Sequence, residues 1–423
     1  MKVDVLLGLQ WGDEGKGKIV DYLAPKYDVV ARFQGGPNAG HTLKFDSIKH
    51  VLHQIPSGIF RNDIKNYIGN GVVLDLVILR KEIEALFNYN LKPVDNLYIS
   101  KKTQLILPTH RLLDAAYEKL KGKNKIGSTL KGIGPAYQDK VARIGLRVGD
   151  ILRTDFEERY EKLSKKHEDL LNSLEFEYDL TELKKEFYDA VAFIKDYKLV
   201  DGEYFISSQL DQGKTVIAEG AQGSLLDIDF GNYPFVTSSN TTAAGAAIGL
   251  GIAPSLIGHV FGIFKAYCTR VGSGPFPTEL MDDLGEKLRA EGHEYGATTG
   301  RPRRCGWLDL PALKYAIMIN GVSKLFMMKA DVLSGMEKIN VCTSYKLPDG
   351  SITEKIPYEI NDMKIEPQMI EFDSWPEIGD TTVYSELPEN LRKYVDYLES
   401  ELKVPIEIIS TGPDRKNTVL RNP

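Results

Sequence analysis

Hydrophobic positions along the chain fall into short, almost uninterrupted runs that glycine-rich or charged stretches separate. Such runs are typical of buried strands. They lie at residues 3–9, 27–36, 66–75, 96–107, 214–223, 259–272, 323–331 and 404–415. Helical patterns lie between them, at residues 18–25, where Pro25 ends the segment, and at residues 74–87. This order of strand, glycine loop, helix and strand predicts an α/β fold with a large, mostly parallel central sheet flanked by helices.

Residues 151–200 have a different pattern, because charged residues alternate there with apolar residues at helical spacing. We interpret this stretch as a helical insertion, although a solvated helix face is the simpler explanation for any single charge in it. The sequence contains no internal repeat, low-complexity segment or obvious flexible linker. The prediction is therefore one domain, residues 1–423, with a helical insertion around residues 151–200.

The composition of the chain excludes several classes of protein. The hydrophobic share of 42% is enough for a large core, and 53 basic against 59 acidic residues give a net charge of −6. This mild acidity argues against a nucleic-acid binder. Three widely spaced cysteines, Cys268, Cys305 and Cys342, suggest neither a disulfide framework nor a zinc site, and they fit a reducing compartment. The apolar run at residues 3–9 is too short for a secretion signal, and no stretch approaches the ~20 apolar residues that cross a membrane. We therefore expect a cytoplasmic protein with neither nucleic acid nor membrane as a partner.

The first candidate site is the loop that follows the first predicted strand. Residues 12–18, GDEGKGK, fit the phosphate-loop pattern G-x-x-x-x-G-K. Such a loop turns backbone N–H groups and the positive end of the next helix towards a phosphate. The pattern then requires a Ser or Thr to bind magnesium, but the chain has Ile19, so the carboxylate of Asp13 is the candidate replacement. A packed glycine turn, with Asp13 as an acid favoured by the helix dipole, is the alternative.

Two further glycine-rich stretches could reach the same edge of the sheet. Residues 33–42, FQGGPNAGHT, predict a second loop after a strand, in which His41 lies between a glycine and a threonine and is well placed for catalysis. Residues 127–150 begin with glycines and hydroxyl side chains that can wrap an anion. Arg143 and Arg147 would share one helix face if that segment is helical. A turn followed by a basic surface explains the last stretch as well.

An arginine-rich stretch lies at residues 296–309, where Arg301, Arg303 and Arg304 occupy three of four consecutive positions. Guanidinium groups repel one another unless anions bind between them, and their planar fork suits carboxylate or phosphate. The stretch therefore indicates an anion site, with a basic surface loop as the alternative.

A candidate base pocket lies at residues 325–331, where a predicted strand ends in Lys329-x-Asp331. The carboxylate of Asp331 could accept hydrogen bonds from N1–H and N2–H₂ of guanine, which adenine does not offer, and the lysine stem could cover the base. Residues 410–415, STGPDR, could line the same pocket. Lys-x-Asp is a common string, so an ordinary strand end is the alternative.

Taken together, these stretches resemble the adenylosuccinate synthetase family. The resemblance spans essentially the whole chain in the family's order, and it rests on WGDEGKGK, QGGPNAGHT, GIGPAY, EGAQG, YPFVTSSNTTA, GPFPTE, GATTGRPRR and STGPDR. It implies a homodimeric ligase that forms adenylosuccinate from IMP, L-aspartate and GTP with Mg²⁺, the first committed step of AMP synthesis in purine biosynthesis. It also implies a fold related to the P-loop nucleotide-binding folds.

The resemblance gives Asp13 the roles of catalytic base and magnesium ligand. Removal of the N1 proton of IMP would let O6 attack the γ-phosphorus of GTP, and the amine of aspartate would then displace phosphate from 6-phosphoryl-IMP. His41 matches the general acid that stabilises charge on the phosphates, and Lys16 and Gln222 complete the implied catalytic set. The carbonyl of Gly40 is the second implied ligand of one Mg²⁺ per subunit.

The resemblance also implies three sets of binding residues. GTP contacts are implied for Gly12, Asp13, Glu14, Gly15, Lys16, Gly17, Lys18, Gly40, His41, Thr42, Arg303, Lys329, Ala330, Asp331, Ser410, Thr411 and Gly412. IMP contacts are implied for Asp13, Lys16, Asn38, Ala39, Gly40, His41, Thr129, Arg143, Gln222, Thr237 and Arg301. Aspartate contacts are implied for Ala297, Thr298, Thr299, Gly300, Arg301, Pro302 and Arg303. Arg143 is implied to reach IMP from the partner subunit.

The chain departs from the family pattern at three positions. Leu130 and Lys131 interrupt a Thr-Gly-Arg-Gly string, and Pro302 lies inside the arginine run. These departures concern the loops for the IMP 5′-phosphate and for aspartate rather than the reaction.

Two other functions fit part of the pattern. A regulatory GTPase or GTP-dependent kinase of related fold would not need aspartate, and the arginine-rich and His41 stretches argue against it. An inactive binding or scaffold protein of the same fold would be expected to lack Asp13 or His41, and the chain keeps both.

Overall fold

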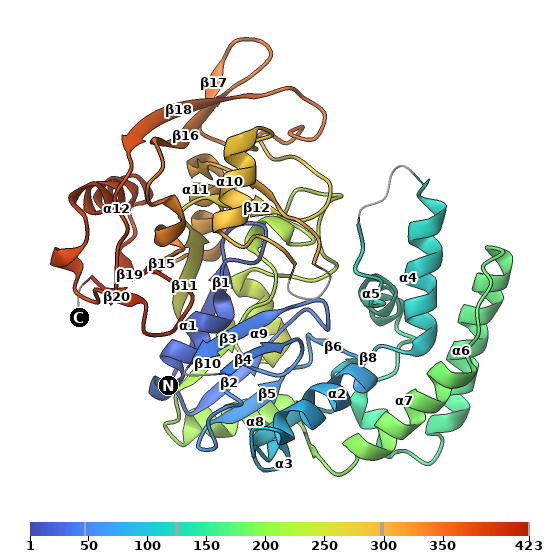
Figure 1. The fold of residues 1–423 in the computed structure, drawn as a ribbon. Coiled ribbons are helices and arrows are strands. Elements are labelled where there is room, and N and C mark those ends of the chain that lie inside the picture. The colour runs from blue at the N-terminus through green and yellow to red at the C-terminus, as the bar shows by residue number, and fades with distance from the viewer. Residues whose placement is uncertain (46–47, 123–126, 297–299, 422–423) are drawn as a thin grey trace.

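The centre of the molecule is a ten-stranded sheet with the order β20-β19-β15-β11-β1-β10-β2-β5-β7-β9 (Figure 1). It is seen in a computed structural model that describes residues 1–45, 48–122, 127–296 and 300–421. Its strands are β1 (Val3–Gly8), β2 (Val29–Arg32), β5 (Lys65–Ile68), β7 (Leu97–Ser100), β9 (Lys198–Val200), β10 (Val216–Glu219), β11 (Ile257–Lys265), β15 (Lys324–Met328), β19 (Ile406–Ser410) and β20 (Thr418–Leu420). Neighbouring strands are parallel except β19 and β20. The predicted mostly parallel sheet is thus confirmed.

The apolar runs form strands because the centre of the sheet is covered on both faces. All residues of β2 and β10 are buried, as are all of β1 except the half-buried Asp4. A strand that faces packed helices on both sides is apolar at nearly every position. The three strands align with Val3 opposite Val216, and Val216 opposite Val29.

The parallel strands bring the candidate loops to one edge. Because these strands run in the same direction, their carboxyl ends lie together, and open α/β sheets bind ligands at that edge. The loops that leave β19, β15, β11, β1, β10 and β2, six consecutive strands of the sheet, start at this edge. Lys18 and Asn417, which are 399 positions apart in the sequence, are thereby brought together at the start of α1 (Lys16–Leu23).

The remaining helices flank the sheet or form separate layers (Figure 1). They are α2 (Leu76–Phe87), α3 (Pro93–Asn96), α4 (Pro108–Leu120), α5 (Ile133–Ala142), α6 (Phe156–Ser173), α7 (Thr181–Ile194), α8 (Gly202–Asp211), α9 (Ala243–Leu250), α10 (Asp283–Glu291), α11 (Leu310–Asn320) and α12 (Glu389–Leu402). Short 3₁₀ turns are η1 (Ala24–Lys26), η3 (Val148–Leu152), η4 (Ser224–Leu226), η5 (Pro254–Leu256), η6 (Ala330–Leu333) and η7 (Tyr384–Glu386). No helix among the described residues is long and apolar enough to cross a membrane.

The stretch predicted as a helical insertion contains α6 and α7. They lie on one side of the molecule with α4 and α5 (Figure 1), where α4 packs against α5 and α6, and α7 packs against α2. The packing buries Tyr160, Phe187 and Ile194. The division of the chain into one domain with this insertion stays a prediction.

Several predicted elements differ from those observed. Three predicted strands are each divided between two strands, because the chain turns at 69–72, 101–103 and 266–267; the second members are β6 (Val73–Leu74), β8 (Gln104–Leu105) and β12 (Cys268–Arg270). The pattern also did not predict the four-stranded sheet of β14 (Leu308–Asp309), β16 (Lys338–Lys346), β17 (Ile352–Thr353) and β18 (Glu366–Asp373). The remaining short strands are β3 (His41–Phe45), β4 (Ile48–Leu52) and β13 (Arg304–Gly306).

Two of these differences concern candidate site residues. His41 and Thr42 were expected in a loop, but they begin β3 because this segment pairs with β4 in an antiparallel ladder. Arg143 and Arg147 were expected to share a helix face. Instead α5 ends before Arg143, which adopts a left-handed conformation with φ 63°, so the two side chains do not lie on one helix.

Candidate active site

The loop between β1 and α1 is organised by a carboxylate of its own. Gly12 and Asp13 have φ values of 87° and 60°. The buried side chain of Glu14 accepts hydrogen bonds from the backbone N–H groups of Gln10 (3.1 Å) and Gly12 (2.9 Å), and from Lys16 Nζ (2.6 Å). The carboxylate of Glu14 therefore fixes the shape of the loop. The carboxylate of Asp13, with its side chain 36% exposed, is the acid that the loop presents.

Lys18 joins this loop to the loop that leaves β19. Its ammonium group donates to Ser410 Oγ (2.7 Å) and to the carbonyl oxygens of Gly412 (2.8 Å) and Asn417 (2.8 Å). These bonds use all three of its donors. Burial lowers the pKa of Lys18 to about 8. In this structure the amine of Lys18 holds two candidate GTP loops together instead of pointing free towards a phosphate.

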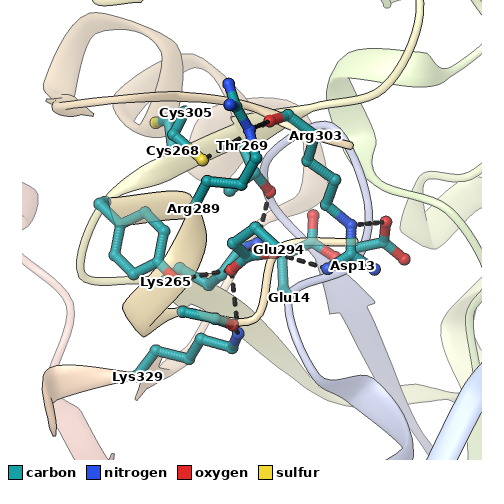
Figure 2. A network of polar contacts seen from close by, with 12 residues as sticks. Asp13, Glu14, Lys265, Cys268, Thr269, Arg289, Glu294, Arg303, Cys305 and Lys329 are labelled. Atoms are coloured by element: carbon teal, nitrogen blue, oxygen red, sulfur yellow. Dashed lines mark hydrogen bonds and ion pairs between the residues drawn. The ribbon is translucent and has the colours of Figure 1, made fainter. Parts of the chain in front are cut away.

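Asp13 is paired with the arginine-rich stretch (Figure 2). Arg303 Nε donates to Asp13 Oδ2 at 2.7 Å, and Arg303 Nη1 donates to Glu294 Oε2 at 2.5 Å. One guanidinium thus bridges an exposed carboxylate and a fully buried one. Asp13, the candidate general base, is therefore in direct contact with Arg303 of the candidate aspartate loop.

His41 lies on a buried carboxylate next to the phosphate loop. Its Nδ1 is 2.5 Å from Glu219 Oε1, and Glu219 also accepts from the backbone N–H (2.8 Å) and the hydroxyl (2.5 Å) of Ser57. A Cβ atom added to Gly17 would lie 3.0 Å from His41 Cβ, so α1 and β3 approach closely. Burial, and then the charge of Arg32, lower the pKa of His41 to about 4. The ring is therefore neutral at neutral pH, with Nδ1–H donating to Glu219.

Gln222 and Asn38, both candidate IMP contacts, meet at the mouth of the same loop. Gln222 Nε2 donates to Asn38 Oδ1 at 3.2 Å, and Lys16 Nζ donates to the carbonyl oxygen of Gln222. Gln222 has φ 56°, a left-handed conformation that turns it towards the phosphate loop. Its Oε1 is buried and has no hydrogen-bond partner among the described residues, so it is available to a ligand donor.

Two more buried side-chain oxygens belong to residues of the candidate pocket for the guanine base. Asp331 Oδ1 and Thr411 Oγ1 are both buried without a hydrogen bond to any part of the chain that the structure describes. Burial raises the pKa of Asp331 above its usual value, although the charge of Lys329 opposes the shift. Lys329 has φ 62°, and its ammonium contacts Gly292 O (2.5 Å) and Glu294 Oε1 (2.9 Å). The pocket thus offers acceptors that a ligand with adjacent N–H groups could satisfy.

The other candidate residues are less buried. A Cβ atom at Gly127 would lie 2.9 Å from Arg301 Nη1, which brings Arg301 to the stretch that contains Thr129. Thr129 and Arg143 are exposed, and Thr237 is half-buried with its backbone N–H bonded to Leu226 O (2.9 Å).

Part of the candidate aspartate set lies outside the described residues, namely Ala297, Thr298 and Thr299. Of the described remainder, Gly300 has φ 65° and Pro302 forms a bridge with Tyr295.

One histidine and aspartate cluster resembles a metal site but is satisfied by hydrogen bonds. His110 Nε2 and His167 Nε2 lie 2.8 Å and 3.0 Å from Asp139 Oδ2, on α4, α6 and α5. His110 Nδ1 accepts the backbone N–H of Leu107 (2.9 Å), so the proton of the neutral ring is on Nε2. A protonated nitrogen cannot bind a cation. The oxygen donors of Asp13 and Gly40 fit magnesium better.

Sequence reasoning missed two carboxylates that hold the candidate site residues. Glu219 ends β10 inside the EGAQG string, so its position at a strand end was a usable signal. Glu294 follows α10 without any motif of its own, and only the fold brings it to Arg303 and Lys329.

A family model described as adenylosuccinate synthetase matches residues 5–419. The chain belongs to the adenylosuccinate synthetase family. It is 59% identical to the adenylosuccinate synthetases of Christiangramia forsetii and Cytophaga hutchinsonii, over 100% of this chain and 100% and 99% of those proteins. A solved structure of fully ligated adenylosuccinate synthetase from Plasmodium falciparum covers 100% of both chains with 43% identity and a TM-score of 0.95.

A more distant structure, a cyanophage S-2L succinoaminodeoxyadenylate synthetase bound to dGMP and dATP, is 21% identical with a TM-score of 0.64 and is similar in fold. The family and fold class predicted from the sequence are confirmed. The ligase prediction is likewise confirmed at the level of the family, in preference to a GTPase, a kinase or an inactive scaffold.

Proposed function

We propose that the loops at the carboxyl edge of the sheet catalyse the reaction of the adenylosuccinate synthetase family, in which GTP is hydrolysed to GDP and phosphate as IMP and L-aspartate are joined. The observation that carries the proposal is the buried Asp331 Oδ1, which has no hydrogen-bond partner among the described residues. An unsatisfied buried acceptor costs about 1–3 kcal/mol, so the pocket is completed by a ligand with suitable donors. Guanine supplies two, N1–H and N2–H₂. In this proposal Thr411, whose Oγ1 is also buried without a partner among the described residues, and Lys329 would line the guanine pocket.

Asp13 acts as the general base. Its carboxylate is partly exposed at the start of α1, beside the Gln222 and Asn38 pair that would receive IMP. Taking the N1 proton of IMP moves negative charge onto O6, which then attacks the γ-phosphorus of GTP. Before the substrates arrive, Asp13 is ion-paired with Arg303. Once an anionic substrate binds Arg303, the carboxylate is released for N1.

His41 stabilises the charge that develops on the transferred phosphoryl group. The ring is neutral without ligands because its pKa is about 4. Bound phosphates favour protonation of the ring at Nε2. The carboxylate of Glu219, opposite Nδ1, balances the positive charge of the protonated ring. Nε2–H then donates to the phosphate oxygens, as expected for preorganised electrostatic stabilisation.

Magnesium would be held by Asp13 and the carbonyl oxygen of Gly40. Both are hard oxygen donors of the kind that Mg²⁺ prefers, and Ile19 cannot supply the usual hydroxyl. When bound, the ion would neutralise charge on the β- and γ-phosphates.

The active site is completed across a homodimer by Arg143. This side chain is exposed at the end of α5, next to the exposed Val141. An Arg143→Leu protein mixed with an Asp13→Asn protein should regain activity, because one site of the mixed dimer carries neither change. Absence of recovery after verified subunit exchange would contradict a shared site.

We also propose a cytoplasmic location. Cys268, Cys305 and Cys342 are free thiols, which fits a reducing compartment, and cell fractionation with activity in the cytosolic fraction would test it.

The central experiment is an omission assay. Absorbance near 280 nm is followed after mixing the protein with IMP, GTP, Mg²⁺ and L-aspartate, and then with each component left out. Product should require all four, and Asp13→Asn should abolish it. GTP hydrolysis at full rate without aspartate would instead favour a GTPase, and turnover by Asp13→Asn would remove the role given to Asp13.

A further inference from the structure

A single carboxylate, that of Glu294, joins residues from three different parts of the site (Figure 2). Its Oε1 accepts from Lys265 Nζ (3.0 Å), Lys329 Nζ (2.9 Å) and Tyr267 Oη (2.5 Å), and its Oε2 accepts from Arg303 Nη1 (2.5 Å). The side chain of Glu294 is 0% exposed. Glu294 and Arg303 are also joined through their backbones, because the N–H of Arg303 donates to Glu294 O at 2.9 Å.

We propose that Glu294 is a positioning residue that sets Arg303 and Lys329 as one unit. This inference rests on the proposed function, in which Arg303 contacts aspartate and GTP, and Lys329 borders the guanine pocket. The two cations do not contact each other in the part of the chain that the structure describes, so the shared carboxylate aligns them. The guanidinium can leave Asp13 for a substrate anion while its other nitrogen stays on Glu294.

The charges explain why a carboxylate is needed here. Burial alone would raise the pKa of Glu294, but Lys265, Lys329 and Arg303 together hold it well below its usual range. Lys265, with its side chain 0% exposed, is the fully buried partner of this carboxylate, and burial lowers the pKa of its ammonium group. Arg303 and Lys329 are partly exposed, at 10% and 32%, so they can keep contact with Glu294 and still reach a ligand.

The test compares Glu294→Gln with a matched control, Glu279→Gln. Glu279 pairs with Arg304, the neighbour of Arg303, through Arg304 Nε at 2.7 Å and through Nη2. Among the described residues, the ammonium of Lys329 bonds to Gly292 and Glu294 and not to Glu279. In Glu294→Gln an NH₂ group takes the place of one acceptor oxygen. We expect KM for GTP and KM for aspartate each to rise about 10-fold or more, the effect of losing a charged hydrogen bond. Glu279→Gln should leave both KM values near wild type.

A second variant separates positioning from folding. Lys265→Met combined with Glu294→Gln removes the buried cation together with the carboxylate, and replacing both members of a buried ion pair is far less destabilising than removing one. The double variant should melt near the wild-type temperature and keep both KM defects. Unchanged KM values in either folded variant, or a rise in only one of the two, would overturn the inference.

The two variants Asp13→Asn and Glu294→Gln distinguish a failure of the proposed function from a failure of this inference. If Asp13→Asn abolishes product and Glu294→Gln behaves as wild type, only the positioning role is wrong. If Asp13→Asn itself turns over, the residue roles on which the inference rests are wrong.

Discussion

His41 and His110 both lie on buried carboxylates, and burial lowers the pKa of both rings. His110 has a partner for each nitrogen, the N–H of Leu107 on Nδ1 and Asp139 on Nε2. His41 bonds only through Nδ1, to Glu219, and its Nε2 makes no hydrogen bond to the residues that the structure describes. A histidine whose two ring nitrogens both have partners, like His110, holds helices together and is structural. A histidine with one nitrogen that has no partner among the described residues, like His41, can donate a hydrogen bond to a substrate.

The first and largest expected effect comes from His41→Asn. It should lower kcat by ~10²-fold or more, since that is the usual contribution of a positioned proton donor. KM for GTP should change less, because the help is confined to the charged transition state. Steady-state kinetics with varied GTP measure both. A change in KM alone would make His41 a binding residue and remove the contrast with His110.

The second prediction changes the carboxylate instead of the ring. Glu219→Gln should lower kcat roughly tenfold or more, since a hydrogen bond to a charged group is worth about 1.5–3 kcal/mol. The amide can still accept from Ser57, so the fold should persist, and circular dichroism is the check. Wild-type kcat in a folded Glu219→Gln protein would show that His41 works without its carboxylate.

The third prediction concerns His110, the structural histidine. His110→Asn should lower the free energy of unfolding by about 1–3 kcal/mol, because it disturbs the buried acceptor Asp139. Urea denaturation measures the loss. The kcat value should fall much less than in His41→Asn, since His110 and Asp139 are on α4 and α5 rather than on the strands around Asp13, although α5 also leads to Arg143. A large loss of kcat with unchanged stability would reverse the roles assigned to the two histidines.

The last prediction concerns the slope of stability with pH, which is a small effect for each pH unit. Both rings resist protonation in the folded state, so the unfolded chain binds more protons once the pH falls below the ordinary value of 6.5. Stability should therefore decline on acidification, by at most about 1.4 kcal/mol per pH unit for each histidine. The contribution of His41 should level off near its pKa of about 4. His41→Asn and His110→Asn should each flatten the curve, and an unchanged slope in either would contradict its lowered pKa.

Of these two histidines, the sequence pointed to His41 as a candidate site residue and did not point to His110. His41 stood out because a strand and a glycine loop precede it, and this local pattern led to the prediction of a catalytic role. His110 lies in a helix between ordinary residues, and its partners Asp139 and His167 come from two other helices. No local pattern encodes such a meeting.

The same limit applies to the fold. The apolar runs of β1, β2 and β10 predicted strands because burial on both faces leaves a continuous signal. Strand β18 alternates half-buried and exposed residues and lies outside the central sheet, so its sequence gave a weaker signal. Glu294 was missed for a related reason, since this buried carboxylate is recognisable only through the cations that surround it. Glu219 differs, because its position at the end of β10 was a signal that could have been used.

The position of β1 in the sheet also has a consequence for synthesis on the ribosome. Val3 pairs with Val216 on one side and Ile257 on the other, so the first strand to be made stays without either neighbour until more than half of the chain has emerged. Contacts between such distant residues form slowly and leave apolar edges exposed in the meantime. The nascent chain therefore needs protection from aggregation over this interval, and its phosphate loop acquires its final shape only late in translation.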